Sequence, residues 1–246
     1  MAFYPNNTKY TNYYVKLTND IILNEGTFDQ SGNLSPSATP KAWTPAQQAV
    51  WHFDGNDHYI SGLYINSDSA DNVGLFSYLY GDADNRSNVN NLTIKNSYVR
   101  LTRENPQYGN GYAGVFSGKS YRTDFTNCFS ENNILSTSCY VTAGIVGDSS
   151  NCSFNGVHTS GSVNGSRTIG GIAGYDNSGT FKNCWNEAKI SNEKESIRQS
   201  GGIAGQALNS NFYNCANLGS LYGGSRVGGI VGEAKGVTIQ NCYETV

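Results

Sequence analysis

The chain has 246 residues, a formal net charge of −3 and 14% charged residues. This near-neutral balance, with no basic run, argues against a nucleic-acid partner. No apolar run approaches the ~18 residues that a membrane-spanning helix needs, so we expect no membrane insertion. The chain is also long for a single compact core, a limit that does not apply to a repeat protein in which each unit contacts only its neighbours.

Residues 1–50 are less regular than the rest. Residues 14–21 indicate an early strand and a corner, and residues 24–49, with three prolines, indicate an inserted loop. Residues 1–5 lack the basic and apolar regions of a secretory signal. The last repeat stops part-way through a coil. We expect a fragment of a larger extracellular or cell-surface protein whose signal has been removed.

From residue 51 onward, one four-residue pattern recurs: an apolar or aromatic residue, any residue, Asn or Gly, then Cys or another small or apolar residue. Its first members follow at steps of 34, 31, 29, 27, 31 and 27 residues: Ile60, Ile94, Phe125, Phe154, Phe181, Phe212 and Ile239. Such a period marks a solenoid. No sustained 3.6-residue apolar period occurs, which favours short strands over helices.

We therefore predict an all-β chain folded as a right-handed parallel β-helix, with about seven clear coils of 27–34 residues. It would form one domain over residues 1–246, with an irregular N-terminal coil and inserted loop in 1–50 and the repeats in 51–246. Both ends of this stack are expected to be uncapped. An exposed coil edge invites pairing, so the protein would be a monomer or would assemble end to end.

A glycine motif repeats ten or eleven residues before the later anchors. The glycines at its second position are Gly114, Gly144, Gly171, Gly202 and Gly229. No helix pattern follows the motif to offer its N-terminus to a phosphate, so it does not resemble a nucleotide-binding loop. Close packing of the backbone between coils explains the glycines better.

The third and fourth positions of the repeat also form columns. The third takes only Asn or Gly, the residues that most readily adopt a left-handed backbone, which predicts a corner ladder at Gly62, Asn96, Asn127, Gly156, Asn183, Asn214 and Asn241. The fourth predicts an inward, dry slot at Cys128, Val157, Cys184, Cys215 and Cys242, preceded by Leu63 and Ser97. Free cysteine behaves as a small hydrophobe in such a slot.

The remaining cysteines, Cys139 and Cys152, lie outside this register and either pair with each other or stay free. A zinc site is not expected, because no C-x-x-C pair exists and His52, His58 and His158 are scattered along the chain. We expect no metal and no cofactor.

The chain resembles the GLUG-repeat family of bacterial surface proteins. The resemblance lies in residues 14–21, in residues 53–66, and in the repeated Val-Gly-Gly-Ile-Val-Gly with Asn-Cys-Tyr at 227–232 and 241–243. It implies a secreted or wall-attached protein of a kind that includes adhesins, or a non-catalytic module beside an immunoglobulin A metallopeptidase. The peptidase zinc motif H-E-x-x-H is absent from this chain, and no catalytic residue is carried over.

The residue after the inward slot should point outward, because side chains alternate along a strand. These positions are Tyr64, Tyr98, Phe129, His158, Trp185, Ala216 and Tyr243. Two interpretations stay open. The column is an exposed aromatic face, with Tyr64, Tyr98, Phe129, Trp185 and Tyr243 binding a glycan or a host surface protein, or its rings pack on one another and close the corner.

Other polar residues fit turns better than chemistry. Asp82, Asp84 and Asn85 could offer oxygen ligands to calcium, but they lack the spacing of a calcium loop. Asp54 and Asp57 fit a turn better than an acid–base pair. We expect a non-catalytic extracellular module that serves as adhesin, binding surface or rigid spacer. The alternative is a polysaccharide lyase or glycosidase, which needs carboxylates gathered on neighbouring coils.

Overall fold

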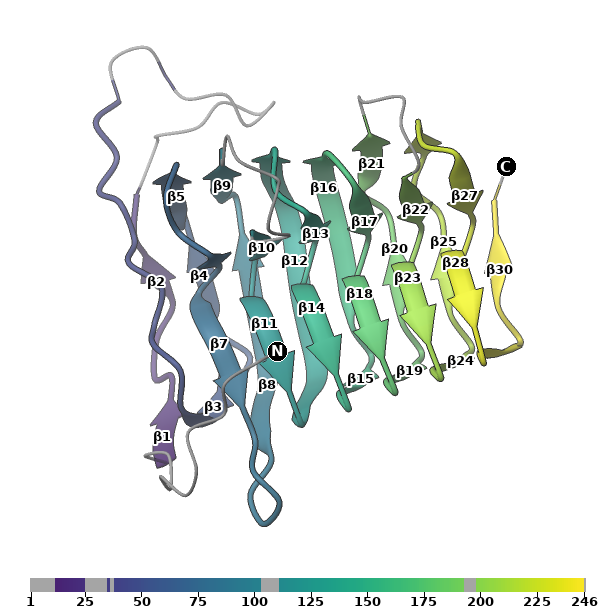
Figure 1. The fold of residues 1–246 in the computed structure, drawn as a ribbon. Helices are drawn as coiled ribbons and strands as arrows, with labels where there is room; N and C mark the ends of the chain where they lie inside the picture. Colours follow the sequence, from purple (N-terminus) through teal and green to yellow (C-terminus); the bar gives the residue numbers. More distant parts are fainter. Residues whose placement is uncertain (1–11, 25–34, 36–37, 103–110, 193–197, 246) are drawn as a thin grey trace.

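The computed structural model describes residues 12–24, 35, 38–102, 111–192 and 198–245. This part of the chain contains no helix, and all its strand pairs are parallel. The strands curl around one axis to give a solenoid-like stack that progresses steadily from the N-terminal to the C-terminal coil (Figure 1). The expected all-β repeat architecture is confirmed at this level. Most of the expected inserted loop, residues 25–34 and 36–37, lies outside the described residues.

Three sheets run along the stack. The second sheet contains β6 (Asn72–Val73), β10 (Tyr112–Gly114), β13 (Val141–Ala143), β17 (Thr168–Gly170), β22 (Gln199–Gly201) and β27 (Arg226–Gly228). The third sheet contains β7 (Phe76–Tyr80), β11 (Ser117–Tyr121), β14 (Val146–Ser150), β18 (Ala173–Asn177), β23 (Ala204–Leu208) and β28 (Val231–Lys235).

The large first sheet wraps around the rest of each coil. Its early strands are β1 (Asn12–Lys16), β2 (Ile21–Ile22), β3 (Val50–Asp54), β4 (Tyr59–Ser61), β5 (Tyr64–Ser67), β8 (Ser87–Lys95), β9 (Tyr98–Leu101) and β12 (Thr123–Thr137). Its later strands are β15 (Ser153–Asn155), β16 (His158–Gly165), β19 (Thr180–Lys182), β20 (Trp185–Asn186), β21 (Lys189–Asn192), β24 (Asn211–Tyr213), β25 (Ala216–Asn217), β26 (Leu221–Tyr222), β29 (Thr238–Gln240) and β30 (Tyr243–Glu244).

A column of phenylalanines forms the centre of the core. Phe125, Phe154, Phe181 and Phe212 are fully buried and pair directly from coil to coil. Successive ring centroids lie 5.1, 4.5 and 4.5 Å apart, with planes within 8° of parallel. The aromatic first position of the repeat is therefore an inward position where identical rings stack on the coil below.

The glycine motif lies where coils approach most closely. A Cβ atom on Gly171 would lie 2.1 Å from the Gly202 carbonyl oxygen, and one on Gly202 would lie 2.1 Å from that of Gly229. These distances exclude any larger residue without movement of the backbone. The apolar residues of the motif, such as Ile172 and Ile203, point into the buried core.

The early coils have a different register from the one expected. Phe125 pairs with Val89, which itself pairs with Phe53, so the step at this corner is 36 residues, outside the expected 27–34. Ile94 pairs with Ile60 at the expected step of 34, but its partner in the next coil is Ser130. Strand β12 crosses both corners, whereas β8 crosses the first and ends at the second, and the apolar-x-Asn-x pattern occurs at both corners. The expected step of 31 residues from Ile94 to Phe125 therefore compared residues at two different corners, which do not pair with each other.

All seven expected corner positions have a left-handed backbone, with φ between 49° and 71°. They divide between two corners. Gly62 and Asn96 belong to the second corner, together with Asn132 and Gly161, whereas the others stack on Asn91 at the first corner.

Hydrogen bonds between side chains connect the first corner. The Nδ2 group of Asn214 donates to Asn183 Oδ1 at 3.2 Å, and that of Asn241 donates to Asn214 Oδ1 at 3.4 Å. Asn183 donates to Asn155 Oδ1 at 3.1 Å, since the neighbouring Gly156 has no side chain. The first corner therefore holds a ladder of asparagine side chains, in which Asn155 takes the place of the side chain that Gly156 lacks.

The inward slot follows the first corner. Cys128, Val157, Cys184 and Cys215 are buried, whereas Cys242 is partly exposed in the last described coil. Cys128 lies over Leu92, so Leu63 and Ser97 belong to the second corner instead of this slot. All six cysteines are free. Cys139 and Cys152 are both buried and do not form a disulfide.

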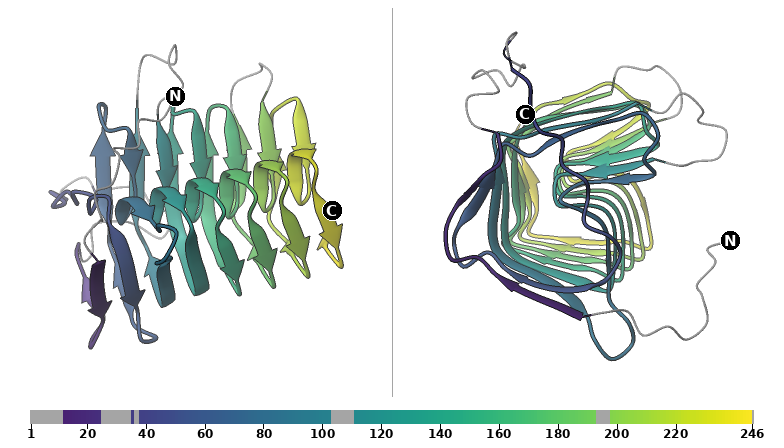
Figure 2. Two further views of the ribbon diagram at one scale, coloured as in Figure 1. Left: turned by 60° about the horizontal axis from the view of Figure 1, so that its bottom comes forward. Right: turned by 90° about the vertical axis from the view of Figure 1, so that its left-hand side faces the viewer.

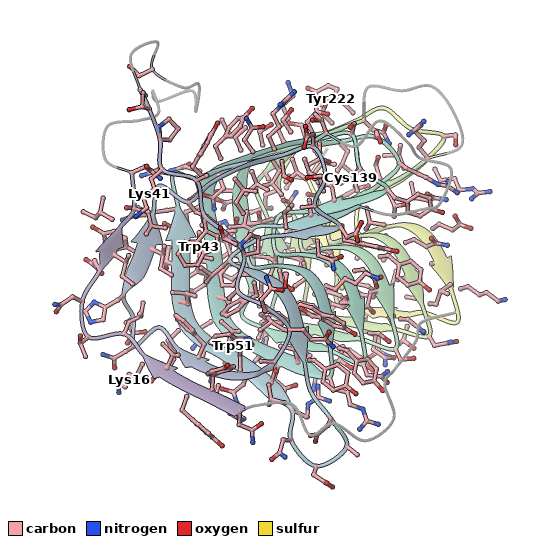
Figure 3. All side chains as sticks on the ribbon, turned by 60° about the vertical axis from the view of Figure 1, so that its left-hand side comes forward. Lys16, Lys41, Trp43, Trp51, Cys139 and Tyr222 are labelled. Carbon is pink, nitrogen blue, oxygen red and sulfur yellow. The ribbon has the colours of Figure 1, made fainter. Side chains whose placement is uncertain are left out.

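The two ends of the stack differ. Trp43 and Trp51 pack against the core at the N-terminal end (Figure 3). The Trp43 indole donates to the Leu75 carbonyl at 3.0 Å, and the Trp51 ring lies 5.1 Å from Phe76. These tryptophans cover part of the core at this end, but Tyr14 is 75% and Ile22 53% exposed, and among the described residues β1 and β2 each pair on one side only. At the other end Val227 is 50% exposed and Ile239 is 48% exposed.

Candidate functional site

The expected aromatic column is two separate clusters. Tyr64 pairs with Tyr98, and their rings stack at 5.9 Å. Tyr98 then pairs with Ile134 and not with Phe129, whose partner in the preceding coil is Thr93. The single column of Tyr64, Tyr98, Phe129, Trp185 and Tyr243 is therefore wrong, for the same reason as the early repeat register: two similar corners were joined.

The rings of the second cluster pack on one another. His158 stacks on Trp185 at 4.7 Å, and Phe129 lies 6.2 Å from Trp185. His158 Nε2 lies 3.2 Å from a Glu187 carboxylate oxygen, while burial lowers the pKa of the imidazole. Phe129 and Trp185 remain partly exposed, and Tyr243 is 59% exposed. The structure thus shows ring-on-ring packing with exposed edges.

The expected turn residues make turn contacts. Asp82 Oδ1 accepts from the backbone N–H groups of Asp84 and Asn85, at 2.9 and 2.8 Å. Asp54 Oδ1 accepts from the backbone N–H of Asn56 at 2.9 Å, which lowers the pKa of Asp54. Within the described ranges, no group of three or more His, Cys, Asp or Glu side chains is placed to hold a metal ion.

One open hollow of about 320 Å³ lies beside the early strands, over β1, β3 and β8. Its wall includes Tyr14, whose ring stacks on His52 at 4.5 Å, and the Lys16–Asp54 ion pair at 3.6 Å. The single carboxylate in this hollow, Asp54, already serves the turn described above. The hollow therefore lacks the pair of carboxylates that glycoside hydrolysis needs.

A more extensive polar surface lies where the second and third sheets meet. Seen along its axis, the stack is indented on one side (Figure 2). Only two residues separate β10 from β11, and the same short link joins the two sheets in each later coil. Each coil therefore turns back sharply at this point, and side chains of the two sheets meet across the corner.

Glycines of the third sheet make this close approach possible. A Cβ atom on Gly147 would lie 2.9 Å from the backbone nitrogen of Ala113, and one on Gly174 would lie 2.4 Å from Val141 Cγ1. Val141 is buried at the base of the corner. The residues immediately after these glycines, and those opposite them on the second sheet, form the outer surface.

We call this surface the corner strip. Its third-sheet members pair in succession from coil to coil: Lys119, Asp148, Tyr175, Gln206 and Glu233. Its second-sheet members are Tyr112, Gln199 and Arg226.

Contacts across the corner confirm that the two sets share one surface. Lys119 Nζ lies 3.9 Å from the centre of the Tyr112 ring. Glu233 forms an ion pair with Arg226 and accepts a hydrogen bond from Gln199 Nε2 at 2.7 Å.

The charges of the corner strip are paired. Lys119 Nζ lies 3.7 Å from an Asp148 carboxylate oxygen, and these side chains are 31% and 23% exposed. Burial raises the pKa of Asp148, with Lys119 opposing the shift. Burial, with a smaller contribution from Asp148, also raises the pKa of Tyr112 to about 12 and that of Tyr175. Both tyrosines therefore stay protonated at neutral pH.

Two members of the corner strip have unused polar groups. Within the described part of the chain, neither the Tyr175 hydroxyl nor the Gln206 side-chain amide has a hydrogen-bond partner. The Tyr175 ring also makes no contact with an aromatic ring or a cation there, unlike the Tyr112 ring under Lys119. Tyr175 and Gln206 are adjacent in consecutive coils and are partly exposed.

The repeat pattern contained a signal for this surface, although the corner strip was not among the expected sites. Each member of the third-sheet set follows directly after the last glycine of the motif, as in Gly-Ile-Ala-Gly-Tyr at 171–175 and Gly-Ile-Ala-Gly-Gln at 202–206. This position changes from Lys to Asp, Tyr, Gln and Glu while the glycine before it stays constant. A position that varies directly after a constant glycine lies on the outer surface, and the glycine sets its place in the coil.

The arrangement can bind, but it does not bring two carboxylates together. Asp148 and Glu233 are three coils apart, which is about 14 Å at the usual spacing of paired strands. Glycosidases hold their two carboxyl groups roughly 5–9.5 Å apart. The corner strip therefore presents aromatic, amide and paired charged groups in a row, with one coil between successive members.

Comparisons with known proteins bear on the fold. No protein-family model and no curated protein matches this sequence. A solved structure from Bacteroides ovatus, described as "a putative immunoglobulin A1 protease", has 19% sequence identity and a TM-score of 0.54. The similarity covers 96% of this chain and 70% of that chain. At this identity the likeness shows a shared fold. Separately, none of the described segments forms a helix long and apolar enough to cross a membrane.

Proposed function

We propose that this chain is a non-catalytic, GLUG-like module of a bacterial surface protein, folded as a right-handed parallel β-helix and exposed outside the cell. Parallel strands joined by a crossover connection are right-handed in nearly all proteins, which supports the handedness. The Bacteroides neighbour, described as "a putative immunoglobulin A1 protease", supports a setting beside such enzymes without supplying catalytic residues.

Within that setting, the module serves as a binding surface or adhesin, and its stacked core also suits it as a rigid spacer. The observation that supports binding is the corner strip, where a constant glycine frame carries a different polar or aromatic side chain in each coil. Repeat proteins commonly bind partners through such extended faces. The expected partners are a glycan or a host surface protein.

The alternative is an enzyme that acts on polysaccharides. It would use charged groups in the corner strip, where Lys119, Asp148 and Tyr112 lie together. The wide separation of the carboxylates favours binding over hydrolysis. Incubating the folded chain with a panel of plant, bacterial and host polysaccharides, and measuring new reducing ends, tests the alternative. Sustained release of product by the chain would refute the non-catalytic proposal.

The binding function is tested by applying the folded wild-type chain to an array of glycans and host-matrix proteins, with and without calcium. We expect reproducible binding to at least one class of ligand, and the same result after calcium is removed. A chain unfolded by heat provides the control for adhesion through exposed apolar surface. The absence of any ligand would contradict the adhesin role and leave the spacer role.

End-to-end assembly is a separate proposal that concerns both ends of the stack. The C-terminal end exposes Val227 and Ile239, and the N-terminal end exposes Tyr14 and Ile22. Sedimentation over a hundredfold range of protein concentration is the test. A mass that stays at one chain throughout would leave the monomer as the working form.

A further inference from the structure

We propose that the corner strip binds an extended, uncharged oligosaccharide that lies parallel to the axis of the stack. This inference rests on the proposed binding function, and it adds the site and the chemical class of the ligand. Tyr175 and Gln206 are the central contacts, with Asp148, Lys119 and Tyr112 around them.

The first argument is chemical. The partly exposed ring of Tyr175 offers apolar surface to the C–H face of a sugar ring, since tyrosine combines a flat apolar body with a polar tip. The Gln206 amide both donates and accepts hydrogen bonds, as sugar hydroxyls do. Neither group has a hydrogen-bond partner in the described structure. A ligand that stacks and hydrogen-bonds at neighbouring points satisfies both residues together.

The second argument is one of spacing. Members of the corner strip are one coil apart, and paired strands are separated by about 4.8 Å. This distance is close to the length that one pyranose ring adds to an extended chain. An oligosaccharide running along the axis therefore places one sugar beside each coil, from Lys119 through Asp148 and Tyr175 to Gln206.

The third argument concerns charge. Lys119 pairs with Asp148, and Arg226 pairs with Glu233, so the corner strip has two positive and two negative groups. A polyanion would have to compete with Asp148 and Glu233 for the cations. An uncharged chain needs no such exchange, and its hydroxyls can use the remaining lone pairs of the carboxylates.

The fourth argument separates a sugar from a peptide. Extended peptides gain much of their affinity by adding a strand to a free sheet edge. Strands β14, β18 and β23 pair on both sides, so this stretch of the corner strip has no free edge. A peptide would leave its own backbone groups without partners here, whereas a sugar chain has no backbone amide ladder to satisfy.

The experiment uses linear hexasaccharides of glucose, mannose, xylose and N-acetylglucosamine, together with uronate hexasaccharides, each titrated calorimetrically against the full chain. We expect an uncharged series to bind with an affinity that added salt hardly changes. Within that series, affinity should rise from the disaccharide to about four or five sugars and then level off, because the corner strip spans that many coils.

Variants locate the site. Tyr175→Ala and Gln206→Ala should each weaken binding tenfold or more. Tyr222→Ala is the matched control, since Tyr222 is 56% exposed on the first sheet, and it should leave affinity unchanged. Circular dichroism verifies that each variant is folded, and Tyr175→Phe, which keeps the ring, should retain most of the affinity.

The outcomes separate this inference from the proposed function. Sugar binding that persists in both corner-strip variants but is lost in Trp185→Ala would place the site on the aromatic cluster and overturn the inference, while the binding function would stand. Salt-sensitive binding of uronates alone, or binding of a host protein alone, would overturn the ligand class. Binding of no sugar here and of no ligand on the array would refute both this inference and the adhesin role, and would leave the spacer role.

Discussion

Asp176 is a buried carboxyl group whose effect on stability can be predicted with its sign. It lies in β18 on the inward side, where it accepts hydrogen bonds from Ser149 Oγ at 2.5 Å, Ser210 Oγ at 2.6 Å and the Gly179 N–H at 2.9 Å. Burial outweighs these bonds and raises the pKa of Asp176 from 3.8 to about 6. The folded chain therefore holds this proton over a pH range in which the unfolded chain has lost it.

The direction of the effect follows from proton linkage. The stabilisation by protonated Asp176 is fully present below pH 3.8, declines as pH rises towards 6, and is absent above. A shift of about two pKa units corresponds to about 3 kcal/mol in the free energy of unfolding. In Asp176→Asn, whose amide does not titrate, this pH-dependent difference should disappear.

Urea unfolding of both proteins at pH 4 and pH 7 measures the effect. We expect the wild type to lose about 2 kcal/mol relative to Asp176→Asn between these pH values, because the unfolded chain is already more than half ionised at pH 4. Other titrating groups contribute to both proteins and cancel in the difference. Asp54→Asn is the control, because its carboxylate lies at the surface and its pKa is lowered. Parallel pH profiles for wild type and Asp176→Asn would refute the account of Asp176.

Three further predictions concern the repeat itself. Phe181→Ala should lower the free energy of unfolding by about 3–5 kcal/mol, as for other buried phenylalanines. The loss should be far larger than for Ile239→Ala at the exposed end, and equal losses would contradict the role of the ring stack. Asn183→Ala should lower the free energy of unfolding by about 1–2 kcal/mol, because alanine is unfavourable in the left-handed backbone at this position. Asn183→Gly should lower it clearly less in the same urea assay. A larger loss for glycine would show that the side-chain ladder contributes more than the backbone conformation. In the native chain, a thiol reagent should label Cys242 first, because the other five cysteines are buried; rapid labelling of a second thiol would contradict that burial.

The later coils could be predicted in detail because every coil places the same positions in the same surroundings. Inward positions stack on their own kind, as Phe154 and Phe181 do. Corner positions need a left-handed backbone, which restricts the sequence to Asn and Gly. Constraints of this kind recur at a fixed period, so a single sequence makes them visible.

The early coils could not be placed correctly, because their two corners impose the same constraints. Ile94 and Val89 are both buried, and Asn96 and Asn91 both have positive φ. A pattern of residue types does not distinguish one corner from the other. Strand pairing does, since Phe125 lies over Val89. The error in register then carried into the aromatic column, which combined Tyr98 with Phe129 although they lie at different corners.

The repeat pattern did not predict the corner strip, and the reason is the opposite one. Repeat analysis finds what stays constant, and the residue after each glycine motif changes from coil to coil, as Asp148, Tyr175 and Gln206 show. A solenoid frame has to be constant, because each coil packs on the next. A surface that binds a ligand has no such requirement, so an outward column that varies beside an unchanging glycine is a place where specificity is expected. In this chain that column is also where Tyr175 and Gln206 have polar groups with no hydrogen-bond partner among the described residues, so sequence variation and available polar groups indicate the same surface.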